Sequence, residues 1–395
     1  MKRRAKEIKR PVRKLILRNF QAPGDIVMLT AAVRDLHRSY PKRFVTDVRT
    51  SCPALWENNP YLTLLDDRAK GVEVIECGYP LIQQSNQGPF HFIHGFTQNL
   101  GEQLQLNIRP SLFQGDIHLS AAEKGWVSQV EEITGRGTPF WIIVAGGKRD
   151  FTAKWWATER YQQVVDYFRG WILFVQVGEA RHYHPALSGV LDLRGRTDIR
   201  QFVRLMHHAQ GVLCPVTFAM HLAAAVEVKD VRGSKFKVPS STEARARRTL
   251  HLEPGTWNRS PTNRPCVVVA GGREPSQWEA YPHHQYIHTI GALPCCAHGG
   301  CWKSRAMPLG DGDAKDQPPH LCTEVVGNLP RCLHAITADE VIRRIELYFQ
   351  GGMVDYLTPQ EWASVAPCLV PSAQHIRANR VRPPGGAWGG RPARW

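Results

Sequence analysis

The first third of the chain alternates short apolar runs with segments of helical periodicity. Lys14–Arg18 (KLILR) is an apolar run of strand length, and Ile26–Tyr40 places apolar residues at helical spacing until Pro41 ends the pattern. The residues between them, 23–25 (PGD), form a glycine-containing loop. A strand, a glycine loop and a helix in this order open a βαβ unit. We expect this first domain to run to about residue 125, with a further strand at Val72–Ile75 and a helix over Phe90–Leu106.

The second part of the chain repeats this alternation more clearly. Phe140–Ala145 (FWIIVA) is a continuous apolar run followed by two glycines, which is typical of a strand buried on both faces. Further strands are expected at Ile172–Val177, Leu191–Leu193, Val212–Val216 and Cys266–Ala270, and helices at 157–169, Ile199–Ala209, Ala219–Val226 and Asp339–Phe349, the last capped by Thr337. The pattern predicts an α/β fold with a parallel, doubly wound sheet. Two such Rossmann-like halves imply a ligand cleft at the carboxyl ends of the strands.

Composition narrows the class of protein. The 395 residues are 43% hydrophobic, which is enough to bury a sizeable core. No uncharged apolar run reaches the length of a membrane span, and the basic N-terminus lacks the apolar stretch of a secretory signal. Ten cysteines are too few for a disulfide scaffold in a chain of this size. We therefore expect a cytoplasmic protein with reduced cysteines.

The net charge of +15 is concentrated in three segments. Residues 1–18 hold nine Lys or Arg against one Glu, residues 228–264 hold nine basic against three acidic residues, and residues 371–395 hold five Arg and no acid. The remaining chain is mildly acidic. Such arms suit an anionic lipid surface or a nucleic acid, and a solvated tail that only aids solubility explains them equally well.

Four segments in chain order resemble glycosyltransferase family 9, the ADP-heptose:lipopolysaccharide heptosyltransferases. They are Leu17, Arg18, Gly24, Asp25 and Tyr40-Pro41 at the start, GGKRDFTAKWW ending in Lys154 and Trp156, VTFAMHLAAA at 216–225, and REPSQWEAYP after Gly271-Gly272. The resemblance covers about residues 13–228 and 265–350. It implies a GT-B architecture, two Rossmann-like domains facing each other across a cleft. The divisions expected are a basic arm (1–12), an acceptor domain (13–125), a nucleotide-sugar domain (126–350) with an insertion at 229–264, and a C-terminal segment (351–395) with a disordered basic tail.

Asp25 is the candidate catalytic residue. An inverting transferase must remove a proton from an acceptor hydroxyl as that oxygen attacks the anomeric carbon, and a carboxylate at a glycine-rich strand end can accept it. Asp25 is the only acid in its loop, and the resemblance implies this role for it. The alternative is that Asp25 only caps the helix that begins at Ile26. Gly24 beside it is expected to contact substrate.

The departing nucleotide diphosphate needs a cation or backbone N–H donors already in place. The resemblance implies that Lys154 is the phosphate lysine, and Thr217 with the N–H groups of Phe218 and Ala219 begins a helix, which is a ready anion site. If these groups supply the charge, we expect no catalytic divalent metal. Lys154 read without the resemblance is a solvated lysine beside two tryptophans. The two weaker candidates for substrate contact are His221, which is alternatively a core histidine, and Glu179, which follows a strand and suits the ribose or base.

The chain departs from the family pattern at the helix after Val212–Val216. The family has Asp-Ser/Thr-Gly where this sequence has Val216-Thr217-Phe218. The missing acid normally helps to hold the donor sugar, and the lost glycine crowds the phosphate site. The departure therefore leaves nucleotide-sugar binding in place and puts heptose as the donor sugar in question.

Half of the ten cysteines fall within 38 residues, in a stretch rich in glycine, proline and histidine. Four thiolates suit a closed tetrahedral site for Zn²⁺ or an iron ion, which would be structural. Cys295 could replace Cys296 as a ligand, and His298 or His320 could replace one of the thiolates. The alternative to a metal site is a set of reduced cysteines without a ligand. Many members of the resembling family carry a similar cluster before the last helix. The candidate ligands are Cys295, Cys296, Cys301, Cys322 and Cys332.

The sequence thus favours an inverting transferase that moves a heptose or related sugar from a nucleotide-diphosphate donor, ADP-linked by resemblance, to a glycan or lipopolysaccharide-type acceptor. The basic tails would contact that anionic acceptor or the inner membrane face. The alternatives are a catalytically degenerate GT-B scaffold and a basic, metal-containing nucleic-acid-binding protein. Nucleic acid is the weaker of these because the basic residues are not interleaved with aromatic residues that could stack on bases.

Overall fold

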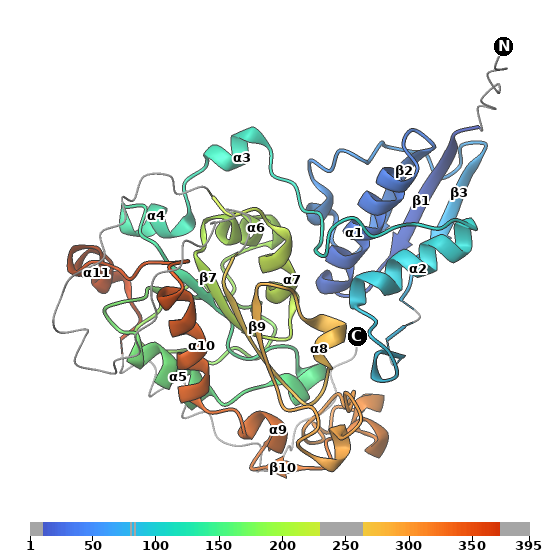
Figure 1. Ribbon diagram of the computed structural model, residues 1–395. Coiled ribbons are helices and arrows are strands. Elements are labelled where there is room, and N and C mark those ends of the chain that lie inside the picture. The colour runs from blue at the N-terminus through green and yellow to red at the C-terminus, as the bar shows by residue number, and fades with distance from the viewer. Residues whose placement is uncertain (1–10, 80, 83, 230–263, 372–395) are drawn as a thin grey trace, which may run out of the picture.

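The computed structural model (Figure 1) describes residues 11–371 apart from 80, 83 and 230–263. The predicted basic arm, insertion and basic tail therefore lie almost entirely outside the described residues. The strands are β1 (Arg13–Asn19), β2 (Phe44–Thr50), β3 (Val72–Glu76), β4 (Trp141–Ile143), β5 (Phe174–Gln176), β6 (Leu191–Asp192), β7 (Gly211–Pro215), β8 (Cys266–Gly271), β9 (His284–His288), β10 (Val325–Val326) and β11 (Leu329–Pro330). The helices are α1 (Pro23–Ser39), α2 (Phe92–Leu104), α3 (Ala121–Gly125), α4 (Gln129–Thr134), α5 (Thr158–Tyr167), α6 (Ile199–His208), α7 (Phe218–Ala225), α8 (Ser276–Glu279), α9 (Arg331–His334), α10 (Ala338–Gln350) and α11 (Pro359–Val365).

The N-terminal unit is built on a parallel sheet of three strands in the order β2-β1-β3. The apolar run in β1 occupies the centre, and Leu15, Ile16 and Leu17 are fully buried there. Helix α1 starts four residues after β1, and twelve of its residues are buried. This helix therefore packs on several sides, and its first turn lies at the carboxyl edge of the sheet.

The C-terminal unit holds six parallel strands in the order β6-β5-β4-β7-β8-β9. Read from the first strand of the unit, this is the doubly wound order 3-2-1-4-5-6, which confirms the predicted fold class. The direction of winding reverses between β4 and β7. Ligands of such sheets bind outside the carboxyl ends of the strands at this reversal.

Alternating side chains of β4 bury the two faces of this sheet. Trp141 and Ile143 belong to a core cluster that includes apolar side chains of α5 and α10. Ile142 and Val144 belong to the cluster on the opposite face, which includes side chains of α6 and α7. This alternation is the period of two expected of a strand, and it explains why FWIIVA is apolar throughout.

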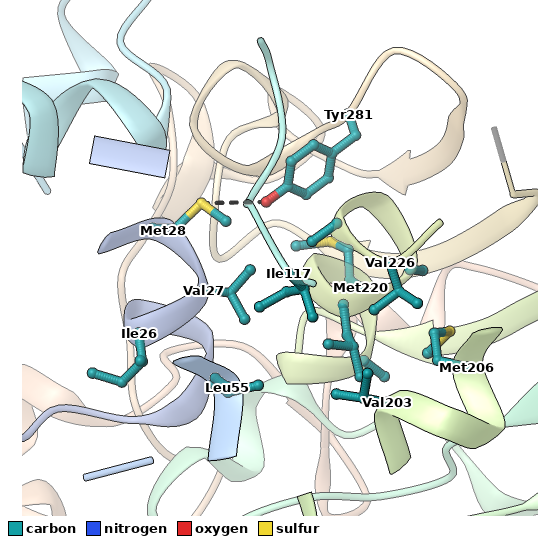
Figure 2. Close-up of a cluster of buried hydrophobic side chains, with 14 of the residues drawn as sticks. Ile26, Val27, Met28, Leu55, Ile117, Val203, Met206, Met220, Val226 and Tyr281 are labelled. Atoms are coloured by element: carbon teal, nitrogen blue, oxygen red, sulfur yellow. Dashed lines mark hydrogen bonds between the residues drawn. The ribbon is translucent and has the colours of Figure 1, made fainter. Parts of the chain in front are cut away.

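The two units share one continuous apolar core. In Figure 2, Val27 and Met28 of α1 approach Met220 of α7, with Ile117 between the helices. The Tyr281 hydroxyl reaches across and donates to Met28 Sδ at 3.3 Å. The first turns of α1 are therefore packed directly against the C-terminal unit, and helices α7 and α8 face the N-terminal unit in Figure 1.

Most predicted elements are confirmed to within a few residues at their ends, including the Thr337 cap, whose hydroxyl accepts from Glu340 N at 3.2 Å. Four strands of the described residues were not indicated by the sequence: β2, β9 and the two-residue strands β10 and β11. The sequences of β2 and β9, FVTDVRT and HQYIH, mix polar and apolar residues, and each strand lies at an edge of its sheet. Periodicity alone does not distinguish such an edge strand from a loop.

Candidate functional site

The carboxyl ends of β1, β4 and β7 supply the backbone of the site. At the end of β4 the chain turns through Gly146, whose φ is 106°. A Cβ at that position would lie 2.0 Å from the Tyr183 carbonyl oxygen, so only glycine fits. The segment that follows Gly146 and Gly147 leads to Lys154, and the segment after β7 begins α7 at Thr217.

Asp25 lies in the first turn of α1. The helix begins at Pro23 and not at Ile26, so Ala22 is the N-cap residue and Asp25 is the third residue of the helix. Asp25 Oδ2 accepts from Ala22 N at 2.9 Å, so the side chain stabilises the start of the helix from inside its first turn. Partial burial raises the pKa of Asp25, while the Ala22 N–H, a hydrogen bond from the Tyr79 hydroxyl and the Lys154 ammonium act in the opposite direction. The capping carboxylate therefore also faces side chains of both units, and the net effect of these contacts is a raised pKa.

Lys154 belongs to a charged triad with two residues from the loop after β8. Its Nζ lies 2.8 Å from Glu274 Oε1, and the Arg273 guanidinium pairs with the same carboxylate oxygen. Burial acts to raise the pKa of Glu274, but the Arg273 and Lys154 charges outweigh it and hold that pKa below its usual range. Two cations against one carboxylate leave the triad with a net positive charge.

His221 is a buried side chain of α7, 4% exposed, and both ring nitrogens face other side chains. Its Nδ1 lies 2.7 Å from Tyr281 Oη and its Nε2 lies 3.3 Å from Glu279 Oε2. Burial holds the pKa of His221 well below the usual range, and burial together with the Glu274 charge raises that of Glu279. The imidazole and the Glu279 carboxyl are therefore both held neutral.

Three buried acceptor atoms of this region have no hydrogen-bond partner within the described residues. They are Thr217 Oγ1, Glu274 Oε2 and Glu279 Oε2. Thr217 precedes α7 without capping it through its side chain, and the Phe218 ring packs on Phe202. Unsatisfied buried acceptors are costly, so the free oxygen of Glu274, within the Lys154 triad, suits a hydroxyl-bearing ligand.

The structure thus brings Asp25, Lys154 and His221 together, with Gly24 against the His221 ring. A Cβ on Gly24 would lie 2.9 Å from His221 Cδ2. Glu179 is separate from these contacts in the described part of the chain, because its half-exposed carboxylate pairs with His182 at 3.0 Å. A ribose or base contact for Glu179 stays a prediction.

The predicted cysteine cluster is brought into one neighbourhood. Burial, followed by the neighbouring thiols, raises the pKa of Cys295 to about 11. Cys296 and Cys332 both pack against Gly272, where a Cβ would lie 2.9 Å from Cys296 Sγ. All ten cysteines are free thiols. Within residues 11–371 that the structure describes, no three His, Cys, Asp or Glu side chains converge closely enough to hold a metal ion.

Sequence reasoning missed the chemistry of the segment after β8. The segment REPSQWEAYP contains Arg273, Glu274, Glu279 and Tyr281, and its resemblance to a strand-end loop does not predict their contacts. A usable signal was present. Charged residues that directly follow a buried strand and a double glycine fall at the same sheet edge as the other site residues.

Comparisons with known proteins point to glycosyltransferase family 9. Residues 102–232 match the model of glycosyltransferase family 9 (heptosyltransferase), and no curated protein matches the sequence. A family 9 glycosyl transferase structure from Veillonella parvula is 13% identical with a TM-score of 0.53, covering 86% of this chain and 98% of its own. The iron-containing dodecameric glycosyltransferase TibC from enterotoxigenic E. coli is 14% identical with a TM-score of 0.53, covering 86% and 77%. The structure of TibC in complex with ADP-D-beta-D-heptose is 15% identical with a TM-score of 0.52, and it covers 86% of this chain and 77% of its own.

At this identity the structural likeness shows the fold, a GT-B arrangement of two α/β units. Together with the family match to residues 102–232, it supports a glycosyltransferase. No helix of the described residues has the length and apolar character needed to cross a bilayer.

Proposed function

We propose that the chain is an inverting glycosyltransferase. It would move a sugar, heptose or a related one, from a nucleotide-diphosphate donor to a hydroxyl of a glycan-type acceptor. The observation that carries the proposal is the meeting of Asp25, from the N-terminal unit, with the Lys154–Glu274–Arg273 triad of the C-terminal unit at the carboxyl edges of both sheets. A base and a net positive anion site on opposite sides of one edge are the two groups that this reaction requires.

Asp25 would act as the general base. Its Oδ1 carries the proton away from the acceptor hydroxyl while that oxygen forms the new bond to the anomeric carbon. The raised pKa of Asp25, caused mainly by burial, makes the carboxylate a stronger base than an exposed one. Oδ2 keeps its hydrogen bond to Ala22 N, which fixes the direction in which the carboxylate points.

The bond between the anomeric carbon and the diphosphate breaks on the opposite side, and its electron pair leaves on the phosphate oxygen. Lys154 and the N–H groups at the start of α7, those of Phe218 and Ala219, would receive this charge. The net positive charge of the triad favours a diphosphate over a neutral group. In this arrangement the phosphate oxygens compete with Glu274 for Lys154 Nζ.

The unpartnered carboxylate oxygen of Glu274 suits the donor sugar. Sugar hydroxyls are hydrogen-bond donors, and Glu274 Oε2 is a buried acceptor without a partner in the described residues. Glu274 comes from the loop after β8, whereas Val216 stands where the resembling family has an acid. We therefore propose that this loop contacts the sugar in place of the segment after β7. An ADP-linked donor is the first to test because TibC is described with ADP-D-beta-D-heptose.

A thermal-shift titration with ADP, UDP, GDP, dTDP and ADP-heptose tests the proposal. A ligand at 100 times its Kd adds about 2.7 kcal/mol of stability. We expect a rise in Tm with ADP and a larger one with ADP-heptose. A rise with another nucleotide alone would change the donor, and no rise with any of the five would leave a scaffold without donor binding.

We also propose that the cysteine cluster binds one structural Zn²⁺ or iron ion. The support is the closeness of the thiols, which raise one another's pKa values, and the iron-containing description of TibC. A cation would stabilise the thiolates instead, so side-chain rotation around Cys301, Cys322 and Cys332 would accompany binding. Elemental analysis of purified protein should find about one metal per chain. Cys301→Ser should lose it and Cys77→Ser, outside the cluster, should keep it; a metal-free wild-type protein would end this proposal.

The basic arms are proposed to contact an anionic acceptor or membrane surface. Removing residues 1–12 should release the chain from vesicles containing anionic lipid and leave nucleotide binding unchanged. Binding that persists after removal would place the contact elsewhere.

A further inference from the structure

Two buried polar side chains of the C-terminal unit contact the first turns of α1 on either side of Asp25. The His221 ring lies against Gly24, where a Cβ would be 2.9 Å from Cδ2. The Tyr281 hydroxyl donates to Met28 Sδ at 3.3 Å, three residues after Asp25 (Figure 2). Neither side chain is used by the base or the anion site described above.

Met28 determines which atoms donate in the hydrogen bonds that join His221, Tyr281 and Met28. A thioether sulfur has no proton to give, so the single proton of the Tyr281 hydroxyl goes to Met28 Sδ. Tyr281 Oη must then accept, at 2.7 Å, from a proton on His221 Nδ1. A neutral imidazole carries only that one proton, which leaves Nε2 as an acceptor 3.3 Å from the Glu279 carboxyl. The links from His221 to Met28 are satisfied only in this order.

We propose that His221 and Tyr281 form a clamp that holds the first turns of α1 against the C-terminal unit, and that they are positioning residues for Asp25. The clamp joins the helix that carries the base to the unit that carries the anion site. Its catalytic consequence rests on the proposed function, whereas its mechanical consequence does not. Loss of the clamp should free the turn that contains Asp25 and leave the Lys154 triad in place.

Hydrogen–deuterium exchange measured by mass spectrometry tests the clamp without any transfer assay. Tyr281→Phe removes the hydroxyl that links His221 to Met28 and keeps the ring. We expect amides in a peptide spanning residues 22–30 to exchange about tenfold faster than in the wild-type chain. Exchange within twofold of wild type would overturn the clamp.

Tyr348→Phe is the matched control. Tyr348 is another buried tyrosine of the same unit, and its hydroxyl is bonded to Cys266 O at 3.1 Å and to His283 O at 2.7 Å, away from α1. We expect faster exchange around β8 and β9 and no change in residues 22–30. Equal acceleration of residues 22–30 in both variants would mean general destabilisation and would also overturn the clamp.

Met28→Leu keeps the experiment decisive if Tyr281→Phe fails to fold, because it removes the sulfur acceptor and nearly keeps the volume. It should accelerate the same peptide, and an unchanged rate would count against the clamp. Where transfer is measurable, Tyr281→Phe should lower kcat about tenfold or more with an unchanged Kd for ADP. A wild-type chain that transfers no sugar while Tyr281→Phe loosens α1 would reject the proposed function and keep the clamp.

Discussion

Lys154→Ala tests the anion site, and the triad determines how large its effect should be. Lys154 and Arg273 carry two positive charges against the single carboxylate of Glu274. Without Lys154 the group becomes neutral, so the electrostatic preference for a diphosphate is lost along with one charged hydrogen bond. A hydrogen bond to a charged group contributes about 1.5–3 kcal/mol, which corresponds to an ADP Kd weakened about 10- to 150-fold.

Isothermal titration of ADP into the wild-type and Lys154→Ala chains measures this change. Glu274 keeps Arg273 as a partner in the variant, so we expect the fold to survive. Lys124→Ala is the control because it removes the same charge from an exposed pair with Glu227, at 2.6 Å, and it should leave Kd unchanged. An ADP affinity for Lys154→Ala within twofold of wild type would refute the assignment of Lys154 and move the phosphate site elsewhere.

Three further predictions follow from single contacts. The rate of transfer should fall as pH is lowered through the raised pKa of Asp25, because the base must be unprotonated. Tyr79→Phe removes a hydrogen bond that lowers this pKa, so the acid limb of the kcat/KM profile should move to higher pH. An acid limb that does not move would show that Tyr79 does not influence the base. Gly146→Ala should prevent folding or lower Tm sharply because its Cβ would meet the Tyr183 carbonyl oxygen. Gly291→Ala, at a φ of 89° with open space around it, should lower Tm only by the effect of its backbone strain. Equal losses of Tm in the two variants would contradict the steric argument. Arg305→Leu should lower the midpoint of urea unfolding because the guanidinium pairs with both Asp311 and Asp316, and an unchanged midpoint would show that this loop is held by other contacts.

The sheet architecture was predictable because its central strands are apolar on both faces. The apolar runs FWIIVA and CVVVA predict β4 and β8, and the glycines after them indicate the carboxyl edge of the sheet, where ligands bind. Strands β2 and β9 were not predictable because polar residues interrupt their apolar pattern, whereas β3 and β6, which also lie at sheet edges, were predicted. Asp25 and Lys154 were predicted as site residues through motifs in the segments that follow β1 and β4.

The partners of these residues could not be read from the sequence. Glu274 lies 120 residues after Lys154, and only the parallel order of β4, β7 and β8 brings their loops together. The same holds for Tyr281 and Met28, which come from different units. Motif spacing within one segment carries no information about such contacts, which depend on how two separately predictable sheets pack against each other.

Asp25→Asn is the measurement that tests the central claim most directly. The variant keeps the size of the side chain and an oxygen that can still accept from Ala22 N, and it removes the base. We expect transfer from the donor that binds in the thermal-shift panel to fall by about 10²–10⁴-fold, with Kd for the nucleotide within about threefold of wild type. Transfer that persists within a few-fold of the wild-type rate would show that Asp25 only caps α1, and would contradict the account.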